Sequence, residues 1–474
     1  MKALLKVTLA AAVLLSLAGV AAAQGSTGGD IGILAWGSGI TWNSSIQIQN
    51  VDPSTAATIE VCYYSQTAPT TPTCLTPSFS PLAAGGSGTI FPLPDQLNPF
   101  NGSVVVSSNT ELAIVSNILA SDYKYGAAYE GISAGAVRVG LPIVQYNNAG
   151  RYFTQFNVQN AGNAQATATC YFYKEGQAAP STTYNLTIEP GAAKTVDLQQ
   201  LPWFQSNVNI GAGEKWVGSV VITSTNGIPI AAVSELLDSS GANGTGLYAY
   251  SGFTGEGAST LYLPTIMDAN NGYWTAVNVQ NQGPGTTNIT ISYIPESGYP
   301  AKAPQTISNV AAMGIAVFLQ SASGTRWVGA ATVSSSGGQK LHAVVNELNT
   351  AVGEGSSYAG FTLSQATAKI YAPLIMQANG GYWTSINIMN LSGSAQTVAV
   401  NYYPSTGYGA KASESRSVGN NSVWVVLQSG TTKWVGSAII TVPAGGKIIA
   451  IVNELNTSKT EPAETMLTYN AFNR

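Results

Sequence analysis

The sequence is poor in charged residues and in histidine. Only 8% of its 474 residues are charged, and 18 basic residues against 22 acidic ones give a net charge of −4. So few Lys and Arg residues, scattered along the chain, cannot assemble the basic patch that a phosphate backbone requires, which argues against nucleic acid as a partner. A hydrophobic content of 45% with so little charge also argues against a disordered chain.

The sequence also contains few residues that could bind a metal ion or carry histidine-based chemistry. His342 is the only histidine, which excludes a multi-histidine zinc site, and it lies on a strand that otherwise consists of apolar residues. No clustered Asp-x-Asp spacing suggests a calcium site with many oxygen ligands. The sequence therefore predicts no metal site, no cofactor and no catalytic residue, and it favours a structural role for His342.

Long apolar runs are missing except at the start of the chain. Lys2 and Lys6 precede an apolar run that ends in small residues before Gln24, which is the pattern of a secretory signal peptide over residues 1–23. The run is shorter than the roughly 20 residues that span a bilayer, so an uncleaved membrane anchor is the less favoured alternative. Val20 stands where a lipoprotein signal would need a cysteine. We expect a secreted protein, extracellular or on the cell surface, without a membrane span.

The most informative property of the chain is that it repeats itself. One phrase ends in an asparagine in each copy, at Asn50, Asn160, Asn281 and Asn390. These residues are 110, 121 and 109 positions apart. We therefore predict four domains after the signal peptide: repeat 1 (24–137), repeat 2 (138–259), repeat 3 (260–369) and repeat 4 (370–474). Repeat 1 is atypical because it lacks the Trp and the Glu of the phrases described next.

Two further phrases recur in repeats 2, 3 and 4. The first contains a Trp-Val-Gly sequence, with Trp216 and Gly218, Trp327 and Gly329, and Trp434 and Gly436. The second contains a glutamate before a leucine, at Glu235, Glu347 and Glu454. A Tyr-x-Gly-Phe phrase follows near the end of repeats 2 and 3, with weaker forms in the other two. We interpret these residues as a repeat signature with a structural or interface role.

The fold class follows from the period of the apolar residues. Apolar and polar residues alternate within the phrases, as in Val277 to Gln280, which is the period of a strand with one buried face. Short strands separated by Asn-Gly and Gly-Gly turns, in units of about 110 residues, predict antiparallel immunoglobulin-like β-sandwiches. A propeller is the second choice, because its blades usually span only about 40–50 residues. Since the connections between copies are short, we expect a semi-rigid rod of sandwiches.

The succession of Leu-Pro-x-Ile-Met, Gly-Tyr-Trp-Thr, Asn-Val-Gln-Asn, Trp-Val-Gly-Ser and Val-Asn-Glu-Leu resembles a tandem β-sandwich repeat of secreted bacterial surface proteins. The resemblance covers essentially the whole chain after residue 23. It implies secretion and a repeated sandwich, and it supplies no active site.

Glutamate, tryptophan and tyrosine residues are the candidates for a site. The glutamates of the signature are the best candidate acids, but a glycosidase needs paired carboxylates and no acidic partner recurs with them. A structural carboxylate is favoured, bound to backbone or tyrosine groups or paired with Lys215, Arg326 or Lys433. For the signature tryptophans, packing over the neighbouring glycine in the core or between domains is favoured, and sugar stacking is the alternative. Tyr299 and Tyr408, in matched turns, are compatible with both interpretations.

The three cysteines divide into a pair and a single residue. Cys62 and Cys74 frame a Pro-rich loop in repeat 1, and a secreted protein permits a disulfide there. Cys170 aligns with small residues in the other repeats and is predicted to be a buried thiol.

These observations favour a non-enzymatic extracellular structural or adhesive protein that self-associates into a surface layer, sheath or filament. One alternative is an array of polysaccharide-binding modules, and a secreted hydrolase is less favoured.

Overall fold

The computed structural model describes residues 18–21, 42–66, 69–97, 100–120, 125–199, 202–208, 213–238, 246–320, 324–351, 353–456 and 466–473. Within these ranges the protein is all-β, with antiparallel sheets and very little helix, so the predicted all-β class is confirmed. The helical turns in the described residues are short: α1 (Pro202–Asn207), η1 (Asp95–Leu97), η2 (Ser336–Gly338) and η3 (Leu363–Gln365).

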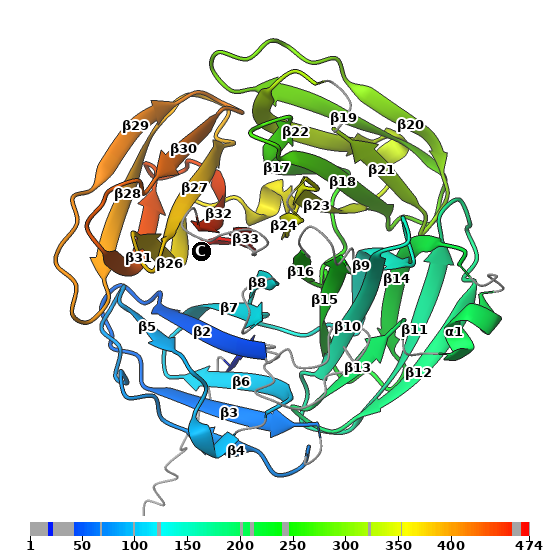
Figure 1. The fold of residues 1–474 in the computed structure, drawn as a ribbon, viewed down its shortest axis with the longest axis horizontal. Coiled ribbons are helices and arrows are strands. Elements are labelled where there is room, and N and C mark those ends of the chain that lie inside the picture. Colours follow the sequence, from blue (N-terminus) through cyan, green and yellow to red (C-terminus); the bar gives the residue numbers. More distant parts are fainter. Residues whose placement is uncertain are drawn as a thin grey trace, which may run out of the picture.

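Each repeat contributes one sheet whose last strand lies at the centre of the molecule (Figure 1), and we call these the axial sheets. Their strand orders are β5-β2-β7-β8, β13-β10-β15-β16, β21-β18-β23-β24 and β30-β27-β32-β33. The strands are β2 (Trp42–Asn50), β5 (Ser87–Ile90), β7 (Leu112–Ala120), β8 (Gly126–Glu130), β10 (Tyr152–Asn160), β13 (Ala193–Asp197), β15 (Ile230–Asp238), β16 (Leu247–Ser251), β18 (Trp274–Asn281), β21 (Ile315–Leu319), β23 (Leu341–Asn349), β24 (Glu354–Ala359), β27 (Tyr382–Asn390), β30 (Val423–Leu427), β32 (Ile448–Asn456) and β33 (Met466–Asn470).

A second sheet in each repeat lies beside the first and ends in a strand at the rim, and we call these the outer sheets (Figure 1). Their orders are β1-β6-β3-β4, β12-β11-β14-β9, β20-β19-β22-β17-β25 and β29-β28-β31-β26-β34. The strands are β1 (Ala18–Ala21), β3 (Ile59–Ser65), β4 (Thr73–Leu75), β6 (Gly102–Ser108), β9 (Arg138–Tyr146), β11 (Ala166–Lys174), β12 (Thr182–Ile188), β14 (Trp216–Ser224), β17 (Thr260–Asp268), β19 (Thr287–Pro295), β20 (Gln305–Val310), β22 (Trp327–Ser335), β25 (Phe361–Thr362), β26 (Lys369–Gln377), β28 (Gln396–Pro404), β29 (Glu414–Val418), β31 (Trp434–Thr441) and β34 (Phe472–Asn473).

Strand β1 falls inside the range predicted as a signal peptide, and it pairs with β6. The remainder of residues 1–23 lies outside the described residues. Cleavage after Ala23 would remove β1 from the mature protein.

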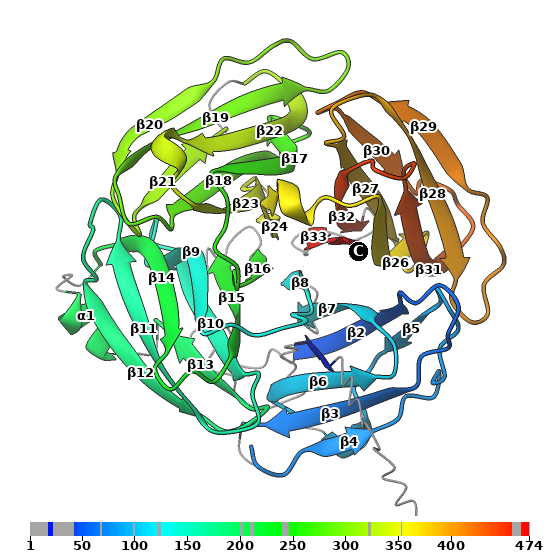
Figure 2. The same cartoon turned by 180° about the vertical axis from the view of Figure 1, so that it is seen from behind.

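The repeats form a closed ring around a central axis, which Figures 1 and 2 show from its two sides. The central strands β8, β16, β24 and β33 contact one another in succession, and β33 also contacts β8, which closes the circle. The predicted rod is therefore wrong, because the last repeat packs against the first. The ring shares with a propeller its arrangement about an axis, although each repeat supplies two sheets.

Packing within the ring explains why the axial strands are so apolar. Strands β15 and β23 are buried at all nine positions, because the outer sheet of the same repeat covers one face and a neighbouring repeat covers the other. Strand β19 of an outer sheet alternates buried and exposed residues, as expected for a strand with one solvated face. The core of repeat 3 continues into repeat 4 through Ile449 and Ile451.

The repeated asparagine of the first phrase anchors a turn in every repeat. Each side chain is fully buried. In repeat 2, Asn160 Nδ2 donates to the carbonyl oxygens of Ala164 (2.8 Å) and Ile188 (2.9 Å), and its Oδ1 accepts from Gly162 N (2.8 Å). Asn50, Asn281 and Asn390 make matching bonds. The phrase recurs because the same buried turn must be satisfied in each repeat.

The serine that follows the Trp-x-Gly sequence links neighbouring repeats. Ser219 Oγ of repeat 2 donates to Met313 O of repeat 3 (2.8 Å), and Ser437 Oγ of repeat 4 donates to Gly85 O of repeat 1 (3.2 Å). Ser103 of repeat 1 bonds in the same way to Gly191 O of repeat 2 (2.6 Å). The same interface thus recurs around the ring, and in repeat 3 an alanine, Ala330, replaces the serine.

Candidate functional site

The three signature tryptophans are core residues. Trp216, Trp327 and Trp434 are 0%, 4% and 6% exposed. A Cβ atom at the glycine two positions later would lie 2.6, 2.6 and 2.5 Å from the indole Cη2 atom, at Gly218, Gly329 and Gly436 respectively. The indole therefore lies over the glycine because no side chain stands in the way. None of these three rings presents a face to solvent on which a sugar would stack.

The signature glutamates do not occupy equivalent positions, contrary to our alignment of the repeats. Phe156 of β10 pairs with Ser234 of β15. The equivalent residue in repeat 3, Val277 of β18, pairs with Val345 of β23. Glu235 therefore takes the place of Asn346, and Glu347 stands one residue further along. Since side chains alternate between the two faces of a strand, this offset of one residue places Glu235 on the opposite face from Glu347 and Glu454.

Glu347 and Glu454 each bond across a contact between repeats. Glu347 of repeat 3 accepts from Asn453 Nδ2 (3.3 Å) and Thr468 Oγ1 (2.9 Å) of repeat 4. Glu454 of repeat 4 accepts from Asn117 Nδ2 of repeat 1 (2.8 Å), although 337 positions separate the two residues. Their hydrogen-bond partners in the described residues are thus amide and hydroxyl groups, not the basic residues that we considered.

Burial changes the acidity of these carboxyl groups. Glu347 and Glu454 are 0% and 1% exposed, and the loss of water raises the pKa of Glu347 to about 7 and that of Glu454 to about 8. The hydrogen bonds that each carboxylate accepts act in the opposite direction and are weaker. Both groups therefore exchange protons near neutral pH in the folded protein.

Glu235 is a further buried acid, and Glu130 is a partly buried one. Glu235 accepts a short hydrogen bond from Gln155 Nε2 of the same repeat, and burial raises its pKa to about 7. Glu130 stands at the end of β8 and accepts a hydrogen bond from the backbone of Asn470, and burial raises its pKa to about 7. Our sequence analysis missed Glu130. The only signal was that a single acid interrupts the Tyr-x-Gly-Phe phrase of repeat 1.

His342 packs at the contact between repeats 2 and 3. Its ring stacks on Phe253 with centroids 4.5 Å apart, and its Nε2 lies 2.9 Å from Gly255 O. Burial lowers its pKa to about 3, so the ring is neutral at physiological pH. Strand pairing aligns His342 with apolar residues in the other repeats, Ala113, Ala231 and Ile449.

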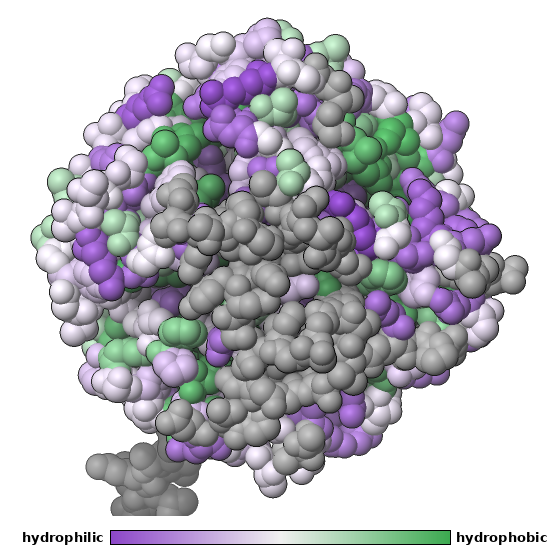
Figure 3. Space-filling view, in the orientation of Figure 1, coloured by the Kyte–Doolittle hydropathy of each residue, from purple (hydrophilic) through white to green (hydrophobic). Residues whose placement is uncertain are grey.

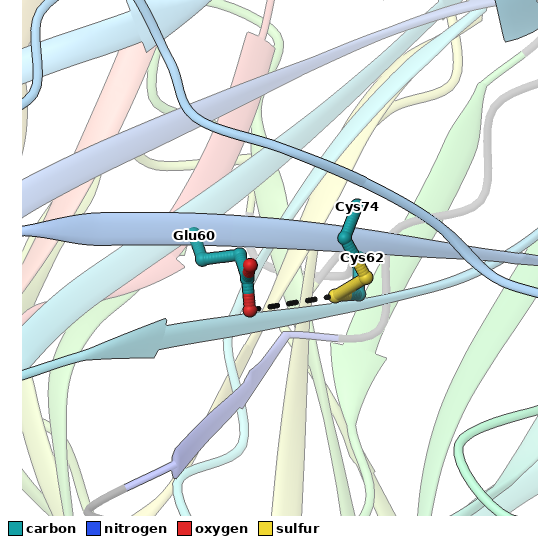
Figure 4. Close-up of side chains that lie close together, drawn as sticks. All are labelled: Glu60, Cys62 and Cys74. Carbon is teal, nitrogen blue, oxygen red and sulfur yellow. Dashed lines mark hydrogen bonds between the residues drawn. A yellow bond between two sulfur atoms is a disulfide. The ribbon is translucent and has the colours of Figure 1, made fainter.

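Figure 4 shows the two cysteines of repeat 1 beside Glu60. Cys62 and Cys74 form a disulfide with a Cα–Cα distance of 4.0 Å, and Glu60 Oε2 lies 3.9 Å from Cys62 Sγ. These three residues lie close enough to surround a metal ion, but the disulfide leaves no thiolate to bind one. Cys170 is a buried free thiol, and burial raises its pKa above the ordinary range.

A pocket of about 740 Å³ lies between repeats 3 and 4, and we call it the groove. Its wall in repeat 3 comes from β17, β22, β24 and the turns that follow β17 and β19, and its wall in repeat 4 comes from β27, β30, β32 and β33. Strands β17 and β27 contact each other here, and Figure 1 shows the two repeats side by side. Three aromatic side chains line the groove: Tyr273, Tyr299 and Trp383.

Two buried polar atoms of the groove have no hydrogen-bond partner in the described residues. They are Thr265 Oγ1 and Asn453 Oδ1, and each residue is 5% exposed. Buried oxygen atoms without a partner are costly, which favours a ligand or water that donates hydrogen bonds at this place. The groove therefore combines aromatic rings with unsatisfied acceptors.

A second pocket, of about 560 Å³, lies on the axis where the Tyr-x-Gly-Phe phrases of the four repeats meet. Two of its polar side chains bond to backbone carbonyls of a neighbouring repeat: Ser251 Oγ donates to Glu130 O (2.7 Å), and Asn470 Nδ2 donates to Ala359 O (2.7 Å). Asn470 Oδ1 also accepts from Ala359 N (2.9 Å). These bonds join neighbouring repeats at the axis. Two other lining residues, His342 and Asn473, have a buried atom without a hydrogen-bond partner in the described residues, Nδ1 and Oδ1 respectively. The groove is the larger of these two pockets, and we take it as the candidate binding site.

The described part of the surface mixes residue types. On the face shown in Figure 3, hydrophobic residues form separate patches between hydrophilic ones. Among the described residues, no helix has the length and apolar character needed to cross a membrane.

No protein-family model matches the sequence, and no curated protein matches it. Among solved structures, the chain is similar to Thermotoga maritima 1070 at 20% identity and a TM-score of 0.20, over 26% of this chain and 97% of that one. It is also similar to a tetra-tandem repeat in the extending region of a large adhesion protein, at 11% identity and a TM-score of 0.11, over 91% and 95% of the two chains.

Proposed function

We propose that this is a secreted, non-enzymatic structural or adhesive protein of the cell surface, built from four immunoglobulin-like sandwich domains that close into a ring. The observation that carries the proposal is the use of the buried acids. Glu347 and Glu454 bond across contacts between repeats, and Glu235 faces the opposite side of its strand. Two of the three best candidates for catalysis, Glu347 and Glu454, thus support the ring itself.

The surface of the ring suits contact with other molecules. Since only 8% of the residues are charged, neighbouring molecules meet with little like-charge repulsion and little desolvation of ions. The outer edge strands β20 and β29 are exposed over most of their length. An exposed edge strand pairs readily with another strand, so ordered self-association through the rim is part of the proposal.

Light scattering and electron microscopy of the purified mature protein over rising concentration test this function. We expect ordered assemblies of rings, or binding of the ring to intact cell walls in a pulldown. A ring that stays monomeric at high concentration and does not bind cell walls would contradict the proposal.

A hydrolase is tested separately. Glu235→Gln, Glu347→Gln and Glu454→Gln variants are compared with the unchanged protein on polysaccharide and peptide substrates. Hydrolysis that disappears in one of these variants would show that the protein is an enzyme.

A further inference from the structure

We propose that the groove between repeats 3 and 4 binds a neutral oligosaccharide. This inference rests on the adhesive function proposed above, for which it supplies a ligand class and a place on the ring. The volume of about 740 Å³ lies within the range of small-ligand sites, roughly 300–1,000 Å³.

The first support is a hydroxyl group that the other described repeats lack. Thr265 follows the proline of β17, and its backbone bonds to Tyr358 Oη (3.2 Å). The same backbone bond is made by Ile143 in repeat 2 and by Leu374 in repeat 4, so apolar residues serve this position elsewhere. The hydroxyl of Thr265 is not needed for the fold, lies in the wall of the groove and has no partner among the described residues.

The second support comes from the facing wall. Asn453 donates through Nδ2 to Glu347, which fixes the orientation of the amide and leaves its Oδ1 without a partner in the groove. At the equivalent place in repeat 3, Asn346 Oδ1 accepts from Ser357 Oγ (2.9 Å). A sugar hydroxyl is the kind of donor that would satisfy the Asn453 and Thr265 oxygens together.

The third support is the aromatic lining. Trp383 and Tyr299 are only partly buried, and they line opposite walls of the groove. The apolar C–H faces of a pyranose ring pack against aromatic faces, while its hydroxyl groups turn toward polar partners. In contrast, Trp274, the equivalent of Trp383 in repeat 3, packs against a cluster formed by Leu236, Tyr248, Ala276 and Leu348.

At the contact between repeats 2 and 3, larger apolar side chains stand at the positions that correspond to Glu347 and Ser356. Repeat 2 has Leu236 and Tyr248 as a cross-strand pair, and both are buried in that cluster. Repeat 3 has Glu347 and Ser356 at the same pair of positions. A serine leaves unfilled the space that a tyrosine ring occupies, and a glutamate turns toward Asn453.

The charges around the groove favour a neutral ligand over an anionic one. Arg326 Nε donates to Asn270 Oδ1 (2.8 Å), and its guanidinium carbon lies 6.0 Å from the centre of the Tyr299 ring. Glu354 accepts a short hydrogen bond from Tyr273, and Glu296 also lines the groove. The two acids outnumber Arg326 and would repel an anionic sugar.

The test is calorimetric titration of the full mature protein with maltohexaose, cellohexaose and fully N-acetylated chitohexaose, beside hexamers of polygalacturonic acid. We expect binding of at least one neutral hexamer and at least fivefold weaker binding by Thr265→Val and by Tyr299→Ala. Thr265→Val removes the hydroxyl while keeping the shape, so its melting temperature should equal that of the unchanged protein.

The matched control is Tyr408→Ala. Tyr408 occupies the same turn in repeat 4 as Tyr299 in repeat 3, and each packs against the core of its own repeat, but Tyr408 does not line the groove. This variant should bind as the unchanged protein does. Absence of binding to all three neutral hexamers, binding to the acidic hexamer alone, or equal binding by Thr265→Val would overturn the proposal, whereas self-assembly measured by light scattering would still report on the structural function.

Discussion

At the scale of single residues, an offset of one position decides what a glutamate does. Glu235 and Glu347 stand in nearly the same local sequence, Ser-Glu-Leu and Asn-Glu-Leu. Strand pairing places them on opposite faces, so only Glu347 reaches the amide of the next repeat. A motif search cannot separate the two cases, because the offset is defined by the partner strand.

The buried acids predict that stability falls as pH rises from about 5 to 8. Burial raises the pKa of Glu347 to about 7 and that of Glu454 to about 8, above the ordinary value of 4.5 that applies in the unfolded chain. The folded protein therefore holds more protons in this window, and raising the pH favours the unfolded state. Differential scanning calorimetry at pH 5, 6, 7 and 8 should show a decreasing melting temperature.

The double variant Glu347→Gln, Glu454→Gln should show a weaker decrease, because an amide keeps the shape of the protonated acid and does not titrate. Glu175→Gln, at an exposed position, is the control and should keep the slope of the unchanged protein. A slope that is equal in all three proteins would show that these acids do not govern the pH dependence.

The cysteines give a prediction at the same scale. Thiol labelling without reductant should modify one cysteine, Cys170, and only after unfolding, because the residue is buried in the core. Cys62 and Cys74 should react only after reduction. Mass spectrometry of the labelled peptides measures both outcomes, and three labelled cysteines in unreduced protein would contradict the disulfide.

At the scale of strands, the Trp-x-Gly sequence places a tryptophan and a glycine next to each other on the same face of a strand in an outer sheet. A side chain at Gly436 would meet both the indole of Trp434 and the backbone carbonyl of Tyr403. Trp434 is itself held by a hydrogen bond from Nε1 to Gly409 O (2.8 Å). Neither the ring nor the strand can move away without loss of packing.

Gly436→Ala should therefore destabilise the protein, by about 1–3 kcal/mol, as is typical when a methyl group is forced into a packed region. Chemical denaturation followed by fluorescence measures the change. Gly409→Ala is the control, because a Cβ atom there would meet nothing within 4 Å. Equal midpoints for the two variants would show that the close approach of Trp434 is not required.

At the scale of the whole molecule, ring closure changes what kind of stability the repeats have. In a rod, each repeat has at most two neighbours and the end repeats have one. Here β33 packs against β8, and Tyr371 Oη of repeat 4 donates to Val51 O of repeat 1 (2.8 Å). Because the core of repeat 3 also includes residues of repeat 4, repeats that share a core should not unfold independently.

Calorimetry should thus show one cooperative transition, with a calorimetric enthalpy equal to the van't Hoff enthalpy. Asn117→Ala, which removes the partner of Glu454 at the contact between repeats 4 and 1, should lower the temperature of this single transition. Asn226→Ala, at an exposed turn within repeat 2, is the comparison and should have a smaller effect. Several separate transitions would indicate independent repeats.

The start of the mature chain gives the last prediction. Intact-mass measurement of secreted material should show a chain that begins at Gln24, because small residues precede this position. A mass that includes residues 1–23 would contradict the signal peptide and would retain β1 on the edge of β6.

The sequence by itself determined the local structure. Alternating apolar residues predicted the strands, Gly-rich segments predicted the turns, and the recurring Trp-x-Gly sequence predicted an indole over a glycine. Each of these depends on residues a few positions apart, whose backbone geometry the residue types themselves restrict. The count of phrases likewise predicted that one unit would recur along the chain.

Only the tertiary structure decided how the units meet. Ring closure depends on contacts such as that between Asn117 and Glu454, 337 positions apart, and no local pattern records which repeat a strand face will cover. The groove depends on the same arrangement, since Thr265 and Asn453 come from different repeats and face one pocket only when repeats 3 and 4 pack side by side. Burial, pKa and ligand access at these residues follow from that packing, because they are set by the atoms that surround a side chain and not by its neighbours in sequence.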